Sequence, residues 1–373
     1  MAFIEKREGR RGRSYRVRVR DPYTGELTSR TFPTRKAVED WLHTQEAKKI
    51  TGTYRDPDAA KVALGTMVDS FISSAIDLAP ATVALYRVMA RRYVAPSIGR
   101  IQVGMIRPQD LRDWTAELAA KGTGAPSIVK ARQLVTRVLG QAVADGIIPA
   151  NPAAFAPPPR STRKDLHVLS PAEVHAIAEG IDPRYRAMVV VMAWCGLRFG
   201  EAAALRRFDV DMHRARLTVA RALSEVRGHV REGGTKTGRT RTVTMPKVVA
   251  EALSDHMGRH PATYVTKMGD LIFTAPDGGY IRRTNWRRRV WVPALERASL
   301  SGIRPHDLRH FGAAVAIAAG AHPKAIQERL GHAPITTTLN IYGALFPSLD
   351  EELAAKLDQV AGASEAEVVA LRK

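Results

Sequence analysis

The sequence contains a single cysteine, few aromatic residues and no long apolar run. One cysteine, Cys195, among 373 residues excludes an internal disulfide and any zinc site built on several cysteines. Because Cys195 lies in an apolar stretch, we expect a buried, inert thiol. The most apolar stretch, residues 187–193, is far shorter than the roughly 18 apolar residues of a membrane span. No export signal follows the first methionine, so the sequence predicts a cytoplasmic protein without a membrane partner.

Acidic residues are scarce relative to basic ones. The chain has 57 Lys and Arg against 37 Asp and Glu, which gives a formal net charge of +20. A field of this sign attracts polyanions, so nucleic acid is the expected partner. Charge alone leaves a ribosome-type protein or a protein of anionic membrane surfaces as alternatives.

Residues 1–58 have the pattern of a small separate module. Strict alternation over 14–20 predicts a strand with apolar side chains on one face and Arg16, Arg18 and Arg20 on the other. Turn residues, a second strand over 27–32 and a helix capped by Thr34 follow. Up to residue 55 there are 14 Lys and Arg against 7 Asp and Glu. We therefore expect the arginine face to contact DNA, with a solvated hairpin face as the alternative.

Residues 64–155 have a helical pattern throughout. Apolar periodicity and breaks at Pro and Gly predict helices over 66–76, 81–94, 108–120 and 126–145. The basic residues among the apolar positions predict a helical bundle that binds DNA through side chains such as Arg91, Arg92 and Lys130.

Residues 156–164 are rich in proline and then basic, which predicts a stiff linker that contacts DNA through Arg160, Arg163 and Lys164. Residues 165–373 follow as a third domain, with helices that begin near Ser170, over 183–194 and over 199–206, and with short strands between 217 and 243. The predicted fold class is mainly α with small antiparallel β elements (α+β).

Four short motifs in the third domain carry polar and ionisable side chains. Residues 195–201 read CGLRFGE, 235–237 read TKT, 306–310 read HDLRH, and 330–332 read LGH, with a tyrosine ten residues further on. They supply the candidate site residues Arg198, Glu201, Lys236, His306, Arg309, His332 and Tyr342.

Each of these residues also has a structural interpretation. Arg198 and Glu201, three positions apart, are compatible with a surface ion pair, and Tyr342 alone with a packed aromatic ring. His306 and His310 share a helical face, as zinc ligands do, but the glutamate of H-E-x-x-H is absent and no third ligand is evident. We expect no metal, and we expect His310 to pack or to bond to the backbone.

Taken together and in this order, the four motifs resemble those of the tyrosine recombinases (the phage integrase family). The match covers the whole second half of the chain, and four ordered motifs over about 150 residues are far more specific than H-x-L-R-H alone. The resemblance implies a site-specific DNA recombinase that cleaves and rejoins DNA through a 3′-phosphotyrosine on Tyr342.

The chemistry of this reaction accounts for the residue types. The transition state carries more negative charge than the phosphodiester, and the guanidiniums of Arg198 and Arg309 are suited to bind its non-bridging oxygens. A phenol has a pKa of about 10, so Tyr342 needs a proton acceptor, for which His306 is the candidate. Lys236 is the candidate general acid for the departing 5′-oxygen.

His332 is expected to add a hydrogen bond to the phosphate, and Glu201 to orient its neighbours. Since joining reverses cleavage and conserves the bond energy, no cofactor is expected.

The three-part order resembles the lambda-type integrases, which act at two classes of DNA site. That resemblance implies arm-site binding by 1–58, core-site binding by 64–155, catalysis by 165–373, and a homo-tetramer on double-stranded DNA. It also implies a host DNA-bending protein and an excision directionality factor as partners in integrating and excising a phage or other mobile element. A conjugative-transposon integrase, a type IB topoisomerase and a catalytically idle DNA-binding regulator are the alternatives.

Overall fold

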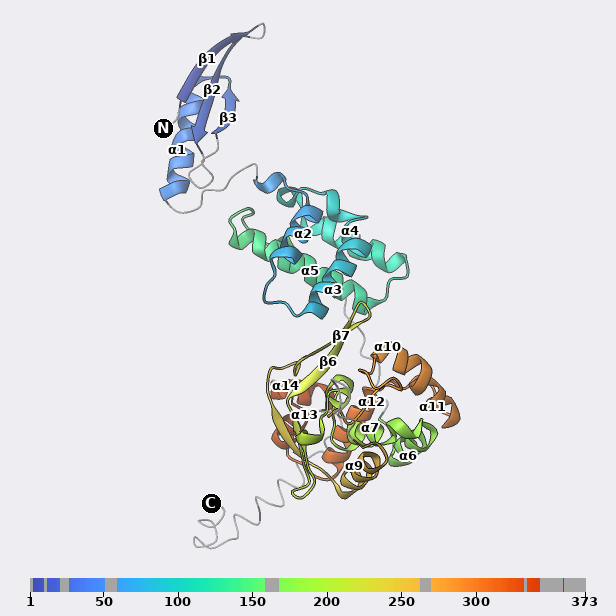
Figure 1. Cartoon of the computed structure of the whole chain (residues 1–373). Coiled ribbons are helices and arrows are strands. Elements are labelled where there is room, and N and C mark those ends of the chain that lie inside the picture. Colours follow the sequence, from blue (N-terminus) through green and yellow to red (C-terminus); the bar gives the residue numbers. More distant parts are fainter. Residues whose placement is uncertain are drawn as a thin grey trace, which may run out of the picture. The chain divides into compact units, whose positions relative to one another are not determined.

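The computed structural model describes residues 3–9, 12–20, 27–50, 59–157, 168–261, 270–331, 334–342 and 358. The chain divides into two compact units, residues 1–163 and 164–373, at the end of the predicted linker (Figure 1). Within the described ranges, no helix has the length and apolar character that crossing a membrane would require.

The first unit begins with a three-stranded antiparallel sheet and a helix. Its elements are β1 (Phe3–Gly9), β2 (Gly12–Arg20), β3 (Leu27–Phe32) and α1 (Arg35–Ile50), with β2 in the centre. The predicted cap is present, because the Oγ1 of Thr34 accepts a hydrogen bond from the N–H of Ala37 at 3.2 Å. Val17, Val19 and Val38 are buried between the sheet and the helix, as the alternation predicted. Strand β1 was not predicted, because consecutive charged residues obscure its pattern.

Residues 59–157 form a bundle around α5, which contacts the other three long helices. The α-helices are α2 (Leu64–Ser74), α3 (Pro80–Met89), α4 (Pro108–Ala120) and α5 (Ala125–Ala144). The short helices are η1 (Ala59–Lys61), the π-helical η2 (Ala90–Val94), η3 (Ile98–Arg100), η4 (Val103–Met105) and η5 (Pro152–Phe155). The helical prediction for this segment is confirmed. Arg132, one of the basic residues among its apolar positions, is buried at 2% exposure.

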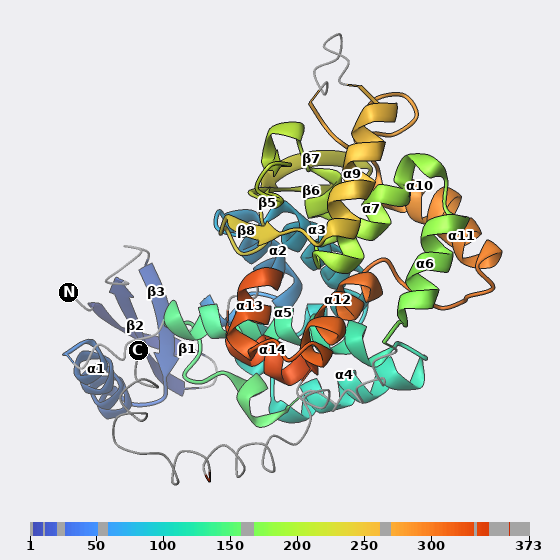
Figure 2. The ribbon, with the colours of Figure 1, turned by 90° about the horizontal axis from the view of Figure 1, so that it is seen from below.

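The second unit is built around α7 (Pro183–Trp194), which from Ala187 onward is apolar on all sides and therefore largely buried. Helices α6 (Pro171–Gly180), α9 (Lys247–Arg259) and α12 (Asp307–Ala318) pack against it. Helix α13 (Pro323–Leu330) contacts both α12 and α14 (Ile335–Tyr342), and the three lie side by side in Figure 2. The remaining helices are α8 (Phe199–Ala203), η6 (Arg207–Asp209), α10 (Arg283–Trp286), the π-helical η7 (Arg287–Trp291) and α11 (Val292–Arg297).

Two small antiparallel sheets complete this unit. Strands β4 (Val210–Asp211), β5 (Arg216–Val219) and β8 (Arg241–Thr244) form one sheet, and the hairpin of β6 (Arg221–Val226) and β7 (His229–Gly234) forms the other. The predicted fold class, mainly α with small antiparallel sheets, is confirmed.

Candidate active site

Three arginines from distant parts of the chain meet at the C-terminal end of α13. The last carbonyl oxygens of a helix have no partner within the helix. Here Arg241, Arg309 and Arg198 donate to the successive carbonyl oxygens of residues 329, 330 and 331, at 2.9, 2.5 and 3.5 Å. The negative end of the helix dipole stabilises cations. It therefore helps to hold together three guanidiniums that would otherwise repel one another.

Local geometry explains why the L-G-H motif has a glycine at its second position. Gly331 ends α13 in the left-handed conformation, with φ of 67°. A Cβ atom at this position would lie 3.1 Å from the Cδ and Nη1 atoms of Arg241. Glycine therefore permits both the helix end and the close approach of the arginine.

A buried carboxylate neutralises part of this charge. The Oε1 of Glu201 accepts from the Nη1 of Arg198 at 2.7 Å, and both carboxylate oxygens accept from Arg241 at 3.1 and 2.8 Å. Burial disfavours the ionised carboxylate, but the hydrogen bonds and charges of the two arginines outweigh it and lower the pKa of Glu201 to about 2. The predicted pair of Arg198 and Glu201 is thus part of a buried network rather than a surface ion pair.

Arg241 belongs to this network, although the motifs did not select it. It is in phase with Val243 on β8, and Val243 is buried, so a strand period of two places both side chains on the inner face. An arginine two positions from a buried strand residue is therefore the sequence signal that could have predicted this buried ion pair.

Arg309 is buried but has no carboxylate partner in the described part of the chain. Its side chain is 1% exposed, and it also donates from Nη1 to the carbonyl oxygen of Gly196 at 2.6 Å. Burial, with a contribution from Arg198, lowers its pKa to about 9, so it remains charged at neutral pH. A buried cation that is bonded only to neutral carbonyl groups is suited to receive an anion.

Tyr342, at the end of α14, lies within this unit at 1% exposure. Its hydroxyl is 2.8 Å from the Nδ1 of His310. Burial raises the pKa of Tyr342 to about 12, against the opposing effect of Arg309 and Arg198. The structure therefore places His310, which we expected to pack or to bond to the backbone, at the tyrosine hydroxyl. It does so because His310 lies one turn further along α12 than His306, where Ala313 also packs near Tyr342.

His306 precedes α12, and its ring centroid is 4.8 Å from that of His310. Burial, and then the charges of His310, Arg309 and Arg198, lower the pKa of His306 to about 4. The imidazole is therefore neutral at pH 7 and is able to accept a proton.

The structure does not bring Lys236 into the arginine cluster. Lys236 is exposed in the turn between β7 and β8. His332 lies outside the described residues, as do Arg160, Arg163, Lys164 and the side chain of Arg20.

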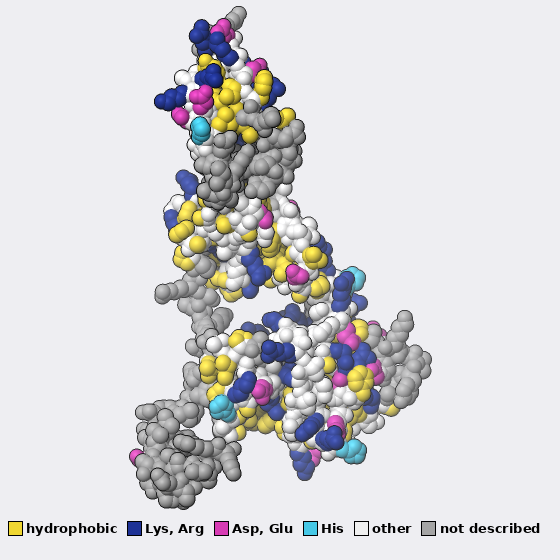
Figure 3. Space-filling view, turned by 90° about the vertical axis from the view of Figure 1, so that its left-hand side faces the viewer, with side chains coloured by type: hydrophobic (Ala, Val, Ile, Leu, Met, Phe, Trp, Pro, Cys, Tyr) yellow, Lys and Arg dark blue, Asp and Glu magenta, His cyan; other side chains and the backbone are white. Residues whose placement is uncertain are grey.

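The other residues predicted to contact DNA lie at the surface. Arg18, Arg91, Arg92 and Lys130 are exposed, and Arg16 is half-buried with a hydrogen bond from Nη2 to the Oγ of Ser29 at 2.8 Å. Figure 3 shows Lys and Arg side chains spread over the visible surface of both units. Within the ranges described, no three His, Cys, Asp or Glu side chains are grouped closely enough to hold a metal ion.

Known proteins are similar in sequence to this chain over most of its length. Residues 167–348 match the phage integrase family. The integrase of Mycobacterium phage D29 is 30% identical over 348 residues, which cover 89% of this chain and 90% of that protein. This chain belongs to the phage integrase family.

Other known proteins are also similar to this integrase over most of its length. The ICEBs1 integrase of Bacillus subtilis is 25% identical over 360 residues, covering 91% of this chain and 95% of that protein. The Tn1549 transposon integrase in complex with a circular intermediate DNA has a TM-score of 0.70 at 18% identity, covering 80% and 99% of the two chains. A lambda integrase tetramer bound to a Holliday junction has a TM-score of 0.58 at 17% identity, covering 86% and 94%. At these identities the solved structures establish a shared fold.

The integrase is therefore a site-specific recombinase of the tyrosine type, an enzyme that cleaves and rejoins DNA, as the motifs predicted. Its family favours this activity over the topoisomerase and the idle regulator that the motifs alone left open.

Proposed function

We propose that this integrase inserts and excises a phage genome by cleaving double-stranded DNA through a covalent bond to Tyr342. The observation that carries the proposal is the cluster of guanidiniums at the end of α13, near a buried tyrosine. In this cluster Arg309 is buried and has no carboxylate partner among the described residues. A phage element is preferred because the phage D29 integrase is 30% identical over 89% of this chain, whereas the ICEBs1 integrase is 25% identical.

In the proposed reaction, Arg198 and Arg309 bind the non-bridging oxygens of the scissile phosphate. The oxygen of Tyr342 attacks phosphorus, and neutral His306 accepts the phenolic proton. His310 holds the hydroxyl in the DNA-free protein. Because Tyr342 is 1% exposed there, α14 must shift when DNA binds.

The remaining residues have supporting roles in the same scheme. Lys236 protonates the departing 5′-oxygen, and His332 adds a hydrogen bond to the phosphate. Glu201 holds Arg198 in place through its two-sided network with Arg241. The 5′-hydroxyl of a second strand then attacks the phosphotyrosine, so no cofactor takes part.

The assembly that we propose is a homo-tetramer on two DNA duplexes in the bacterial cytoplasm, at the nucleoid. Residues 1–58 bind arm sites through the β2 arginines, residues 64–155 bind core sites through Arg91, Arg92 and Lys130, and the linker contributes Arg160, Arg163 and Lys164. The tetramer seen for lambda integrase on a Holliday junction supports this plan. A host DNA-bending protein and an excision directionality factor complete it.

The test is a nicked suicide duplex built from the sequence that flanks the gene, mixed with protein and run on a denaturing gel. We expect a covalent protein–DNA adduct with the wild type and none with Tyr342→Phe. Tyr185→Phe is the matched control, because Tyr185 is also a buried tyrosine of the second unit, at 2% exposure. Specific binding without an adduct from the wild type would contradict the proposal.

A further inference from the structure

Lys236 needs an accurate position, yet the hairpin that precedes it is small. It lies two residues beyond β7, and β7 pairs only with β6 among the described strands. A two-stranded hairpin is marginally stable by itself. Since a general acid must lie within hydrogen-bond reach of the leaving oxygen, contacts from outside the hairpin have to fix β7.

Glu232 makes polar contacts that attach β7 to the rest of the unit. Its carboxylate accepts from the Nη2 of Arg206 at 2.7 Å and from the hydroxyl of Tyr280 at 3.0 Å. The Nε of Arg221 on β6 lies 3.8 Å from the same carboxylate. Arg206 also binds Asp270 through Nη1. Arg206, Tyr280 and Arg221 therefore converge on one carboxylate, and the Glu232 side chain is 23% exposed.

The residue paired with Glu232 on β6 contacts α8, the helix that follows Arg198. Glu232 is opposite Leu223 in the β6–β7 register. The carbonyl oxygen of Leu223 lies so close to Gly200 of α8 that a Cβ atom there would overlap it. The residue that attaches β7 and the residue of β6 that contacts α8 are therefore paired across the hairpin. Because α8 directly follows Arg198, the position of β7 is coupled to that of Arg198.

The turn that contains Lys236 transmits this position. Thr235 is 7% exposed, and its Oγ1 donates to the carbonyl oxygen of Arg239 at 2.8 Å. The N–H of Gly238 donates to the carbonyl oxygen of Thr235 at 2.9 Å. The turn is therefore closed on both sides of Lys236, and its placement depends on where β7 ends.

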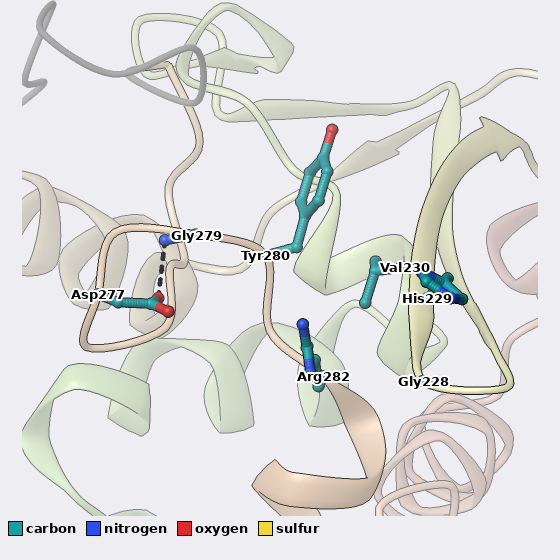
Figure 4. A pocket seen from close by; sticks show the side chains of 7 residues that line it. All are labelled: Gly228, His229, Val230, Asp277, Gly279, Tyr280 and Arg282. Carbon is teal, nitrogen blue, oxygen red and sulfur yellow. Dashed lines mark hydrogen bonds between the residues drawn. The ribbon is translucent and has the colours of Figure 1, made fainter.

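Packing at the outer end of the hairpin is incomplete, although Val230 packs against the main hydrophobic core of the unit. A cavity of about 310 Å³ lies between the hairpin turn, with His229 and Val230, and the loop with Asp277, Tyr280 and Arg282. Figure 4 shows the ring of Tyr280 extending from that loop, with its hydroxyl directed away from Arg282. The polar contact of Tyr280 with Glu232 therefore links the loop to β7 next to an unfilled space.

We propose that Glu232, held by Arg206 and Tyr280, is a positioning residue that sets the place of Lys236 for protonation of the leaving oxygen. This inference rests on the proposed function. In the step concerned, the bond from Tyr342 to phosphorus forms, the bond from phosphorus to the 5′-oxygen breaks, and the ammonium proton of Lys236 passes to that oxygen.

A sulfur atom in place of the 5′-bridging oxygen distinguishes misplacement of Lys236 from general damage. A thiol has a pKa of about 8.5, so its thiolate leaves without a proton. The experiment measures single-turnover rates of covalent adduct formation on the oxygen and the sulfur duplex at the mapped cleavage site. The variants are Lys236→Ala, Glu232→Gln and Tyr280→Phe, with thermal melts to verify folding.

On the oxygen duplex we expect Lys236→Ala to be slower by about 10²- to 10⁴-fold. We expect Glu232→Gln and Tyr280→Phe to be slower by about 10- to 100-fold. All three variants should react at the wild-type rate on the sulfur duplex. Tyr280→Phe removes a single hydroxyl and so keeps the test decisive if Glu232→Gln does not fold.

Glu225→Gln is the matched control. It makes the same change on β6, where Glu225 accepts from the N–H of Thr284 at 2.9 Å, and should leave both rates unchanged. Wild-type rates for Glu232→Gln and Tyr280→Phe on oxygen, an equal loss on both duplexes, or an equal effect of Glu225→Gln would overturn the assignment. Failure of Lys236→Ala to recover on sulfur would also overturn it. Absence of any adduct from the wild type on either duplex would instead refute the proposed function.

Discussion

Among single residues, Glu201 links the stability of the site to pH. Its pKa falls from an ordinary value of 4.5 to about 2 in the folded protein. The stabilisation is therefore complete above pH 4.5 and is lost as the pH falls toward 2. We predict that Glu201→Gln lowers the free energy of unfolding by about 3 kcal/mol at pH 7, as measured by urea unfolding. The difference from wild type should shrink as the pH falls from 5 to 3, and a constant difference would contradict the linkage.

The hydrogen bond between His310 and Tyr342 also has an energetic consequence. We predict a coupling of about 1 kcal/mol in a double-mutant cycle of His310→Ala and Tyr342→Phe, because each change removes the same buried bond. The measurement is urea unfolding of the two single variants and the double variant. Tyr185→Phe with His310→Ala should be additive, and additivity of the first pair would show that the bond does not form in solution.

Helix α12 carries Arg309 and His310 and begins directly after His306. Its approach to α7 depends on one glycine. A Cβ atom on Gly312 would overlap the carbonyl oxygen of Ala193 in α7. We predict that Gly312→Ala destabilises the protein by about 1–3 kcal/mol and reduces adduct formation, because α12 has to move away from α7. Thermal melts and the suicide-duplex assay measure the two effects.

The matched control for this helix is Gly258→Ala on α9, where a Cβ atom would meet nothing within 4 Å. Alanine is the better helix former, so this variant should be as stable as wild type or up to about 1 kcal/mol more stable. If the two glycine variants melted alike, close packing of α12 on α7 would not be the cause.

For the whole molecule, the net charge of +20 should make DNA binding strongly dependent on salt. Each phosphate contact contributes a slope of about −0.9 to a plot of log K against log salt concentration. We predict that Arg16→Ala with Arg18→Ala makes the slope on arm-site DNA less steep by about 1 to 2, measured by fluorescence anisotropy. Arg35→Ala is the control, because Arg35 lies on α1 and pairs with Glu39 at 3.0 Å. An unchanged slope for the β2 variant would remove these arginines from the interface.

The sequence predicted the local features of this protein better than its contacts. The β2 alternation, the Thr34 cap and the bounds of α4 and α7 follow from short-range patterns, and the structure has them. The burial of Arg132 and the contact of His310 with Tyr342 were not predicted. Both depend on which face of a helix meets another element, and periodicity does not specify the neighbour.

The chemistry follows from the residues alone, because a set of arginines, histidines and a tyrosine in ordered motifs is suited to phosphoryl transfer whatever its surroundings. The packing of the helices was needed to show that Arg241 completes the arginine cluster, and that Tyr342 is buried and hydrogen-bonded to His310. The bond from Arg198 to the carbonyl of residue 331 joins positions 133 apart. Such a contact arises when separate helices pack and the carbonyl groups at the end of α13 need partners, and no local pattern of residues records that event.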